Sequence, residues 1–249
     1  MSSCGLVLLK LSVESLLSQQ SALVELLNFT CERDERMLFS SLSARFYAGQ
    51  VVQILGANGS GKTTLLRILA GVSSDFQGEI LWQGQAIFNC AWEYTNESLY
   101  LGHLAGIKKS LTPLENLRWY AAIQGGVSDE MLLRALVAVN LAGYEDTLCY
   151  QLSAGQLRRV ALARLVFSNA KLWILDEPFT ALDKAGVTLL ETLLASHAAA
   201  GGLVLVTSHQ DIEVPNLQLL NLQDFQDHNN VYGADYQEAA GYQETGAYG

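Results

Sequence analysis

The sequence predicts an α/β fold in which helices cover both faces of a mainly parallel sheet and a helical subdomain is inserted. Short continuous apolar runs, typical of buried parallel strands, alternate with segments of helical periodicity through the middle of the chain. One stretch, about 111–168, breaks this alternation because it contains helical signals alone. We assign that stretch to the inserted helical subdomain.

Composition limits the classes of protein to which the chain can belong. Its 249 residues are 50% hydrophobic and 16% charged, which is ordinary for one globular domain with appendages. No apolar run reaches the roughly 18 residues that a membrane-spanning helix needs. The net charge of −10 argues against a protein that coats nucleic acid, although backbone amides can still bind phosphate locally. We therefore expect a soluble globular protein with no nucleic acid partner.

The cysteines and the N-terminus indicate the compartment. The four cysteines lie far apart and form neither a zinc-binding cluster nor a haem-attachment motif: Cys4, Cys31, Cys90 and Cys149. The apolar N-terminus lacks the basic region and the small-residue cleavage site of a signal peptide. These features predict an intracellular protein in a reducing cytoplasm.

Composition also divides the chain into three zones. We predict an N-terminal extension over 1–22, one domain over 23–222 and a disordered acidic tail over 223–249. The tail contains no lysine or arginine, has few aliphatic residues and repeats tyrosine, glutamine and glycine. A segment of this composition cannot bury enough apolar surface to fold by itself.

The first half of the domain supplies a strand, a helix and a hairpin. Val51–Leu55 is a short apolar strand that enters a glycine-rich loop. The helix that follows, Thr63–Ala70, ends at Gly71 because glycine is favoured just after the last helical turn. Glu79–Gln83 and Ala86–Phe88 flank a glycine, which predicts a hairpin.

The second half supplies helices with clear starting signals and two more strands. Thr112 and Ser153 each open a capping-box pattern, so a helix begins after each, and the second continues to about Ser168. Met131–Val139 is amphipathic and predicts a further helix. A strand, a helix and a strand follow in that order: Leu172–Leu175, Val187–His197 and Leu203–Thr207.

The glycine-rich loop predicts a phosphate site. It follows the pattern G-x-x-x-x-G-K-[ST] and continues into the helix: Gly56, Ala57, Asn58, Gly59, Ser60, Gly61, Lys62, Thr63 and Thr64. Glycines let successive amides point at one phosphate, and the helix dipole adds positive potential. Lys62 would reach the β- and γ-phosphates, and the Thr63 hydroxyl would hold Mg²⁺. The alternative, a glycine-rich turn with a surface lysine, is disfavoured because a strand precedes the loop and a helix follows it.

An acidic pair ends the strand that begins at Leu172. A carboxylate at the carboxyl end of a parallel strand faces the ligand crevice, which suits Asp176 as a second Mg²⁺ ligand. Glu177 projects differently and would polarise the water that attacks the γ-phosphate. Alone, such a pair would more simply be a helix cap or a solvated surface. Together with the phosphate loop it predicts a nucleotide site.

Two later segments resemble the motifs of ABC-type ATPases. These segments are Leu152-Ser153-Ala154-Gly155-Gln156 with the basic helix Leu157–Arg164 after it, and Ala181-Leu182-Asp183, with His209 ending a later strand. The resemblance implies a RecA-like P-loop NTPase core, an inserted helical subdomain and ATP hydrolysis with Mg²⁺. It also implies head-to-tail dimers that clamp ATP between the phosphate loop of one subunit and Ser153, Gly155 and Gln156 of the other, with Asp183 nearby.

Each of these residues also has a plainer interpretation. Ser153 is a helix N-cap, and it can serve as a cap and as a ligand of a second subunit's phosphate at once. His209, taken alone, is a structural histidine. At the end of a strand 32 residues after Glu177, contact with the γ-phosphate becomes the favoured role. We therefore assign catalysis to Glu177, His209 and Lys62.

A narrower resemblance covers about Leu26 to Gln210. Five further segments join the general motifs in resembling the ATP-binding subunits of haem exporters for cytochrome c maturation: Cys31–Arg36, Leu81–Gly84, Leu101–His103, Gly106–Lys108 and Leu114–Leu117. This resemblance implies a peripheral protein on the cytoplasmic face of the inner membrane. It implies integral membrane subunits as partners and, indirectly, a haem-loaded periplasmic chaperone whose release ATP hydrolysis powers.

Two positions depart from the general family. Cys31–Arg36 stands where an aromatic residue stacks on adenine, which leaves Arg33 and Phe29 as alternatives for that contact. His103-Leu104 stands where a glutamine contacts magnesium and the membrane partner. A neutral imidazole can accept a hydrogen bond from a metal-bound water, so His103 is either a partner-sensing residue or a packing residue.

Two other functions are weighed against the transporter subunit. One is a soluble ABC-type ATPase that acts on DNA or ribosomes; the sequence lacks the second ATPase half, the coiled coil and the basic face that such proteins use. The other is a degenerate binding module that does not hydrolyse ATP. The presence of Lys62, Asp176, Glu177 and His209 ranks it last.

Overall fold

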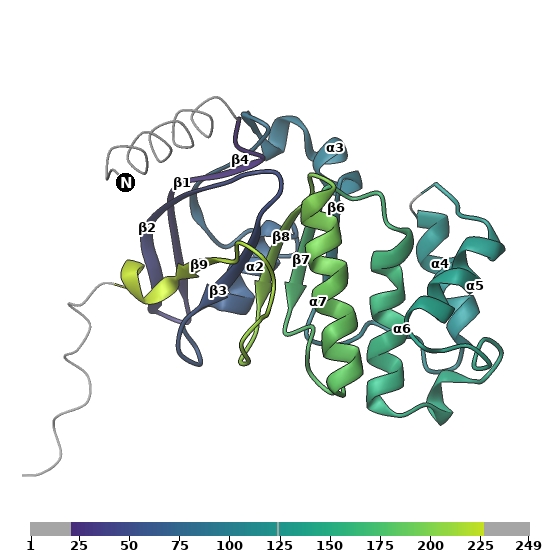
Figure 1. The fold of residues 1–249 in the computed structure, drawn as a ribbon. Helices are drawn as coiled ribbons and strands as arrows, with labels where there is room; N and C mark the ends of the chain where they lie inside the picture. The colour runs from purple at the N-terminus through teal and green to yellow at the C-terminus, as the bar shows by residue number, and fades with distance from the viewer. Residues whose placement is uncertain (1–20, 124, 227–249) are drawn as a thin grey trace, which may run out of the picture.

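A parallel sheet of five strands forms the centre of the molecule (Figure 1). The computed structural model describes residues 21–123 and 125–226. The strands lie in the order β6-β7-β8-β3-β9, and every neighbouring pair is parallel. Their bounds are β6 Ser98–Leu101, β7 Leu172–Asp176, β8 Leu203–Thr207, β3 Val51–Leu55 and β9 Gln218–Asn221. The predicted α/β fold with a mainly parallel sheet is confirmed.

Side chains of the central strands point alternately to the two faces of the sheet, and each face has its own hydrophobic core. On β3, Val52 and Ile54 face one core and Val51 faces the other, because successive side chains of a strand point to opposite faces. Helix α2 (Lys62–Leu69) packs on the first face, and helix α7 (Lys184–Ala199) packs on the second. Burial on both faces explains why the inner strands β7, β8 and β3 are mostly apolar in the sequence.

A second sheet shares the first face with α2, which the sequence analysis did not predict. It is antiparallel in the order β2-β1-β4-β5. The four strands are β1 Val24–Arg33, β2 Arg36–Phe46, β4 Gln77–Trp82 and β5 Gln85–Ala86. We predicted helices on both faces: α2 does lie on that face, and the second sheet covers the rest of it. The long strands β1 and β2 escaped notice because several register shifts interrupt their alternation.

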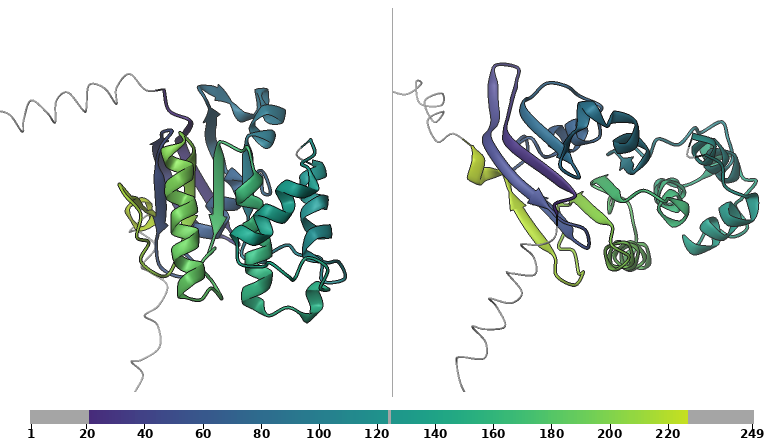
Figure 2. Two further views of the ribbon diagram at one scale, coloured as in Figure 1. Left: turned by 45° about the vertical axis from the view of Figure 1, so that its right-hand side comes forward. Right: turned by 90° about the horizontal axis from the view of Figure 1, so that it is seen from above.

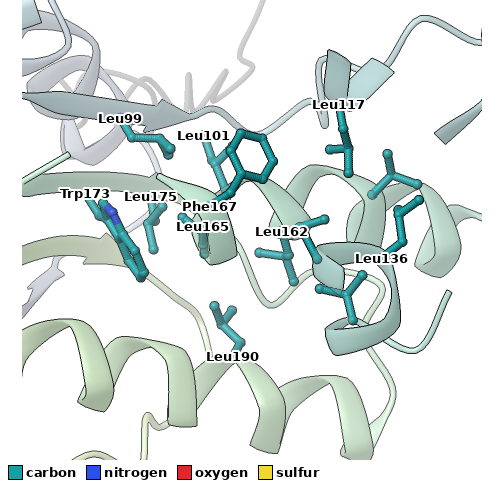
Figure 3. Close-up of a cluster of buried hydrophobic side chains, with 14 of the residues drawn as sticks. Leu99, Leu101, Leu117, Leu136, Leu162, Leu165, Phe167, Trp173, Leu175 and Leu190 are labelled. Atoms are coloured by element: carbon teal, nitrogen blue, oxygen red, sulfur yellow. The ribbon is translucent and has the colours of Figure 1, made fainter. Parts of the chain in front are cut away.

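Three helices between β6 and β7 form the group that we predicted as an inserted subdomain, and they stand to one side of both sheets (Figure 2). They are α4 Pro113–Ile123, α5 Asp129–Ala138 and α6 Ala154–Phe167. Thr112 and Glu115 form the expected capping box of α4, each side chain binding the other's backbone amide at 3.2 and 2.8 Å. Figure 3 shows how Leu162, Leu165 and Phe167 of α6 join this group to Leu99, Leu101 and Trp173 of the sheet.

The remaining elements differ from the predicted bounds by small amounts. The strands at Val51–Leu55 and Leu203–Thr207 have the predicted bounds, and β7 extends one residue further to include Asp176. The predicted hairpin pairs β4 with β5, but its second arm continues as a 3-10 helix, η1 (Ile87–Asn89). The two edge strands of the parallel sheet, β6 and β9, were not predicted. The other short elements that were not predicted are α3 Ala91–Asn96, η2 Cys149–Gln151 and η3 Leu222–Phe225.

The predicted terminal segments lie mostly outside the described residues. Of the extension at 1–22, only residues 21 and 22 are described, and of the tail at 223–249, only residues 223–226. Those four belong to or directly follow η3, so the folded part extends slightly past the boundary that we drew at 222. Within the described ranges, no helix has the length and apolar character needed to cross a membrane.

Candidate nucleotide site

The phosphate loop connects β3 to the start of α2. Gly61 occupies the N-cap position of α2 with a φ of 99°, in the region that glycine alone adopts without strain. A Cβ at this position would lie 3.0 Å from the Phe39 ring and 3.1 Å from Leu38 Cβ, so β2 approaches the loop too closely for a side chain. The Lys62 ammonium lies over the loop and donates hydrogen bonds to the carbonyls of Gly56 and Ala57 at 2.7 and 3.2 Å.

Asp176 lies beside the loop at the end of β7. Its Oδ1 accepts hydrogen bonds from the Thr63 hydroxyl at 3.1 Å and from the Thr207 hydroxyl at 2.9 Å. The carboxylate is 1% exposed, and its Oδ2 has no hydrogen-bond partner among the described residues. A buried carboxylate oxygen in this state is expected to bind a cation or a ligand group.

This donor set fits Mg²⁺ better than a metal held by the protein alone. Within the described residues, no group of three or more acidic, histidine or cysteine side chains could hold a metal. Mg²⁺ usually takes one or two protein ligands and completes its shell with water and phosphate oxygens. One carboxylate and one hydroxyl beside a phosphate loop match that requirement.

Glu177 is held in an uncommon backbone conformation. Its φ is 50°, a region that non-glycine residues rarely adopt. The Thr207 hydroxyl accepts a hydrogen bond from the Glu177 amide at 2.9 Å, and the buried Arg158 guanidinium donates to the Glu177 carbonyl. Burial lowers the pKa of Arg158, and the nearby Asp176 and Glu177 carboxylates oppose that shift. Hydrogen bonds to both the amide and the carbonyl therefore hold the Glu177 backbone in place. They set the direction of the side chain without any contact made by the carboxylate.

The Glu177 carboxylate points toward His209. It is 15% exposed, and its Oε1 lies 3.6 Å from His209 Nε2 and has no hydrogen-bond partner among the described residues. His209 is 65% exposed and lines the same pocket. A nearly buried carboxylate whose oxygen has no hydrogen-bond partner is suited to accept a hydrogen bond from a water molecule.

One pocket of about 540 Å³ brings most of the predicted residues together. Its lining includes Asn58, Gly59, Gly61, Lys62, Thr63, Thr64, Glu177 and His209. His103, whose role we left open, also lines it, as does Arg33. Gly56, Ala57, Ser60 and Asp176 are not among the residues that line it. Phe29 is excluded as a nucleotide contact because it is fully buried and packs against Phe39 and Phe76.

The second group of predicted residues lies elsewhere. Ser153 caps α6 as predicted: its Oγ accepts from the Gln156 amide at 3.2 Å, and Gln156 Oε1 accepts from the Ser153 amide at 2.9 Å. A Cβ on Gly155 would lie 2.8 Å from the Ala181 carbonyl, so the two motifs touch within one chain. Ser153, Gly155 and Gln156 do not line the pocket of the phosphate loop.

Asp183 has a clear local role at the start of α7. Its Oδ1 accepts a hydrogen bond from the Gly186 amide at 2.9 Å and pairs with the Arg159 guanidinium. The Gly186 amide and then Arg159 lower the pKa of this carboxyl. Asp183 does not line the phosphate-loop pocket either, so in a single chain it acts as a helix cap.

Three residues of the site were missed by the sequence analysis. They are Thr207, Arg158 and Arg36, which lines the pocket. Thr207 could have been found, because it ends the strand adjacent to β7 and pairs with Asp176 in the parallel register. The two arginines carry no comparable local signal.

Comparison with known proteins agrees with this geometry. The family profile described as "ABC transporter" matches residues 39–180. The cytochrome c biogenesis ATP-binding export protein CcmA of Saccharophagus degradans is 52% identical over 207 residues, 80% of this chain and 92% of that protein. The protein of the same name from Vibrio cholerae is 54% identical over 198 residues, 79% of this chain and 96% of that protein.

Solved structures show the same fold. A putative ABC transporter ATP-binding protein from Pyrococcus furiosus has a TM-score of 0.71 at 24% identity, over 82% of this chain and 98% of that chain. A dimeric ATP-binding cassette in a post-hydrolysis state with ADP and Pi has a TM-score of 0.65 at 25% identity, over 75% and 88%. The chain therefore belongs to the ABC transporter family and, within it, to the cytochrome c biogenesis ATP-binding export proteins.

Proposed function

We propose that this chain is the ATP-hydrolysing subunit of an exporter for cytochrome c biogenesis and binds integral membrane subunits at the cytoplasmic face of the inner membrane. The observation that carries this proposal is the identity of more than 50% to export proteins over about four-fifths of the chain. The gathering of Lys62, Glu177 and His209 in one pocket supports hydrolysis over binding alone. By this proposal, hydrolysis powers release of a haem-loaded periplasmic chaperone.

The phosphate loop provides binding and charge stabilisation. The amides of Gly59 to Thr63 and the Lys62 ammonium would surround the β- and γ-phosphates of ATP. Positioned donors of this kind stabilise the charge that develops on the transferred group without reorganising during the reaction. Thr63 and Asp176 would hold Mg²⁺, which, when bound, neutralises charge on the phosphate oxygens.

Glu177 would orient the attacking water and accept its proton. The water oxygen forms a bond to the γ-phosphorus as the bond from that phosphorus to the β–γ bridging oxygen breaks, and ADP leaves with the bridging oxygen. The proton of the water passes to the Glu177 carboxylate, and His209 steadies the γ-phosphate. The fixed Glu177 backbone supports this assignment because it keeps the carboxylate in place throughout turnover.

A head-to-tail dimer would complete each site. Ser153 and Ala154 are exposed at the start of α6, away from the pocket of their own chain. A helix N-terminus attracts phosphate, so this end would receive the triphosphate bound to a second copy. The dimeric cassette among the structural neighbours is consistent with this arrangement.

Two substitutions at Ser153 test the dimer. Ser153→Asp and Ser153→Asn both preserve the N-cap, because Asp, Asn and Ser are equivalent caps, but only Asp places a negative charge against the incoming phosphate. We expect ATP hydrolysis to be lost in Ser153→Asp and largely kept in Ser153→Asn. The measurement is the steady-state ATPase rate of each purified variant.

Mixing two inactive variants then separates a dimer from a monomer. In a head-to-tail dimer, Ser153→Asp mixed with Lys62→Ala leaves one intact composite site per mixed dimer. About a quarter of the parental rate is therefore expected from an equal mixture. Activity that does not exceed the sum of the two separate variants would refute the composite site.

Capture from solubilised membranes tests the proposed function as a whole. The Glu177→Gln variant, incubated with ATP, is expected to bring down multi-span membrane proteins of cytochrome c maturation, identified by mass spectrometry. Recovery of unrelated permease subunits would support an ATPase coupled to a transporter and would overturn the assignment to cytochrome c biogenesis. Recovery of the chain alone from the soluble fraction would favour an ATPase that is not coupled to a transporter.

A further inference from the structure

The last described residues of the chain lie against the phosphate loop. Leu222, which begins η3, is fully buried, and its Cβ lies 3.6 Å from where a Cβ would lie on Gly56, the first glycine of the loop. Just after η3, the Gln226 side chain donates a hydrogen bond to the Leu38 carbonyl at 3.4 Å. Leu38 itself lines the nucleotide pocket. The described chain therefore ends beside the wall of the pocket that β2 forms (Figure 1).

The same pocket carries arginine side chains that the rest of the described chain neutralises only weakly. Arg33 and Arg36 line it and are paired directly across the end of the β1–β2 hairpin, where like charges repel. Asp34 lies 3.5 Å from Arg33, but both side chains are mostly exposed, so solvent screens this ion pair. Within residues 21–123 and 125–226, Arg36 forms no ion pair. The wall of the pocket therefore attracts anions, although the whole chain has a net charge of −10.

The segment that follows Gln226, residues 227–249, has the opposite charge. It contains acidic residues but no lysine or arginine, and tyrosines alternate with the acids along it: Asp227, Tyr232, Asp235, Tyr236, Glu238, Tyr242, Glu244 and Tyr248. A guanidinium group binds a carboxylate through charge-assisted hydrogen bonds and an aromatic ring through its planar face. The composition of this segment therefore matches the two arginines of the pocket wall.

The segment is also long enough to reach these arginines. Arg36 is two residues from Leu38 along β2, about 7 Å at the usual rise of a strand. A flexible polar stretch of nine residues, the separation between Gln226 and Asp235, spans about 15–18 Å on average. Tethering at Gln226 raises the concentration of the segment at the pocket to the order of millimolar. Weak ion pairs are then sufficient for binding when no nucleotide is present.

We propose that the acidic segment 227–249 binds the arginine wall of the nucleotide pocket and competes with ATP. The inference rests on the proposed function, because it takes the phosphate loop as the site of the triphosphate. The carboxylates of the segment occupy the guanidinium groups that attract the phosphates of ATP. ATP displaces the segment because it also binds the amides of the loop and Lys62. The segment therefore raises the ATP concentration that the subunit needs, and it leaves the chemical step unchanged.

Neutralising the segment in the whole chain tests this competition. Amides of the same size replace the acids in one combined variant: Asp227→Asn, Asp235→Asn, Glu238→Gln and Glu244→Gln. We expect this variant to bind ATP about 3- to 10-fold more tightly in calorimetric titration, the effect of a few exposed ion pairs. The KM for ATP should fall in parallel. The kcat should stay the same, because the segment has left the pocket once ATP is bound.

A synthetic peptide of residues 227–249 provides the reverse experiment. Added at millimolar concentration to the neutralised variant, it should raise the KM for ATP and leave kcat unchanged, as a competitor does. A peptide with the same four amide substitutions should not. The difference in ATP affinity between the parental chain and the neutralised variant should also shrink at high salt, because ions screen exposed charges.

Arg36→Gln identifies the surface that the segment binds. When this guanidinium is absent, neutralising the segment should tighten ATP binding clearly less than it does in the parental chain, because two groups in contact have non-additive effects. An equal gain in both backgrounds would show that the segment does not bind this wall, and the proposal would be rejected.

Three exposed acids elsewhere in the chain provide the matched control: Glu93→Gln, Glu130→Gln and Asp146→Asn. None of them lines the pocket, so neutralising them together should leave ATP affinity unchanged. Unchanged ATP affinity in the tail variant, or an equal gain in this control, would overturn the proposal while the phosphate loop stood. A failure of the proposed function is distinguishable, because the parental chain itself would then bind no ATP.

Discussion

Replacing Glu177 by glutamine is expected to lower the rate of ATP hydrolysis by about 10²- to 10⁴-fold, the usual contribution of a positioned general base. Glutamine has the same size but cannot accept the proton of the attacking water. ATP affinity should stay close to the parental value, because the carboxylate makes no hydrogen bond to the phosphate loop.

The fold offers a clear reason why this variant should remain folded. The contacts that hold residue 177 at positive φ involve its backbone amide and carbonyl, bound to Thr207 and Arg158, and neither depends on the side chain. With hydrolysis blocked, ATP should hold two chains in a closed dimer. Size-exclusion chromatography with and without ATP measures that state.

Glu130→Gln provides the matched control for the Glu177 variant. Glu130 is an exposed glutamate of α5 that pairs with Arg134, so its substitution should leave the rate unchanged. If Glu177→Gln hydrolysed ATP at the parental rate, the general base would have to be another group, and the assignment of Glu177 would be rejected.

Replacing Lys62 by alanine is expected to weaken ATP binding by about 10- to 150-fold, the equivalent of one charge-assisted hydrogen bond. Among the residues that the structure describes, the ammonium donates hydrogen bonds only to the carbonyls of Gly56 and Ala57. Its loss should therefore change the melting temperature of the free protein little. The increase in melting temperature that ATP produces should largely disappear, because that increase depends on the ratio of ligand concentration to Kd.

Lys171→Ala is the corresponding control. Lys171 forms an exposed ion pair with Glu97, which is worth at most about 1 kcal/mol of stability. ATP should stabilise this variant as much as it stabilises the parental chain. An undiminished ATP response in Lys62→Ala would show that the glycine-rich loop is not the phosphate site.

The features predicted correctly from the sequence are fixed over short distances along the chain. The capping boxes at Thr112 and Ser153 join residues three positions apart, so their signals are visible in any four-residue window. The phosphate loop is likewise one continuous segment whose glycines are required by the local backbone. The three inner strands of the parallel sheet, β7, β8 and β3, were recognisable because both of their faces are buried, which leaves a nearly continuous apolar run. The edge strands β6 and β9 are less buried and were missed.

What only the tertiary structure decided depends on contacts between distant residues. Thr63 meets Asp176 across 113 residues, and Arg158 reaches the Glu177 carbonyl across 19. Pairing of β1 with β2 and β4 buries Phe29 and leaves Arg33 and Arg36 at the pocket wall, although all three lie in one short segment. The sequence by itself determined which chemistry the chain carries, since local backbone and side-chain requirements define the motifs. The packing of two sheets determined which groups face the nucleotide, because strand register and burial are set by partners far away in the sequence.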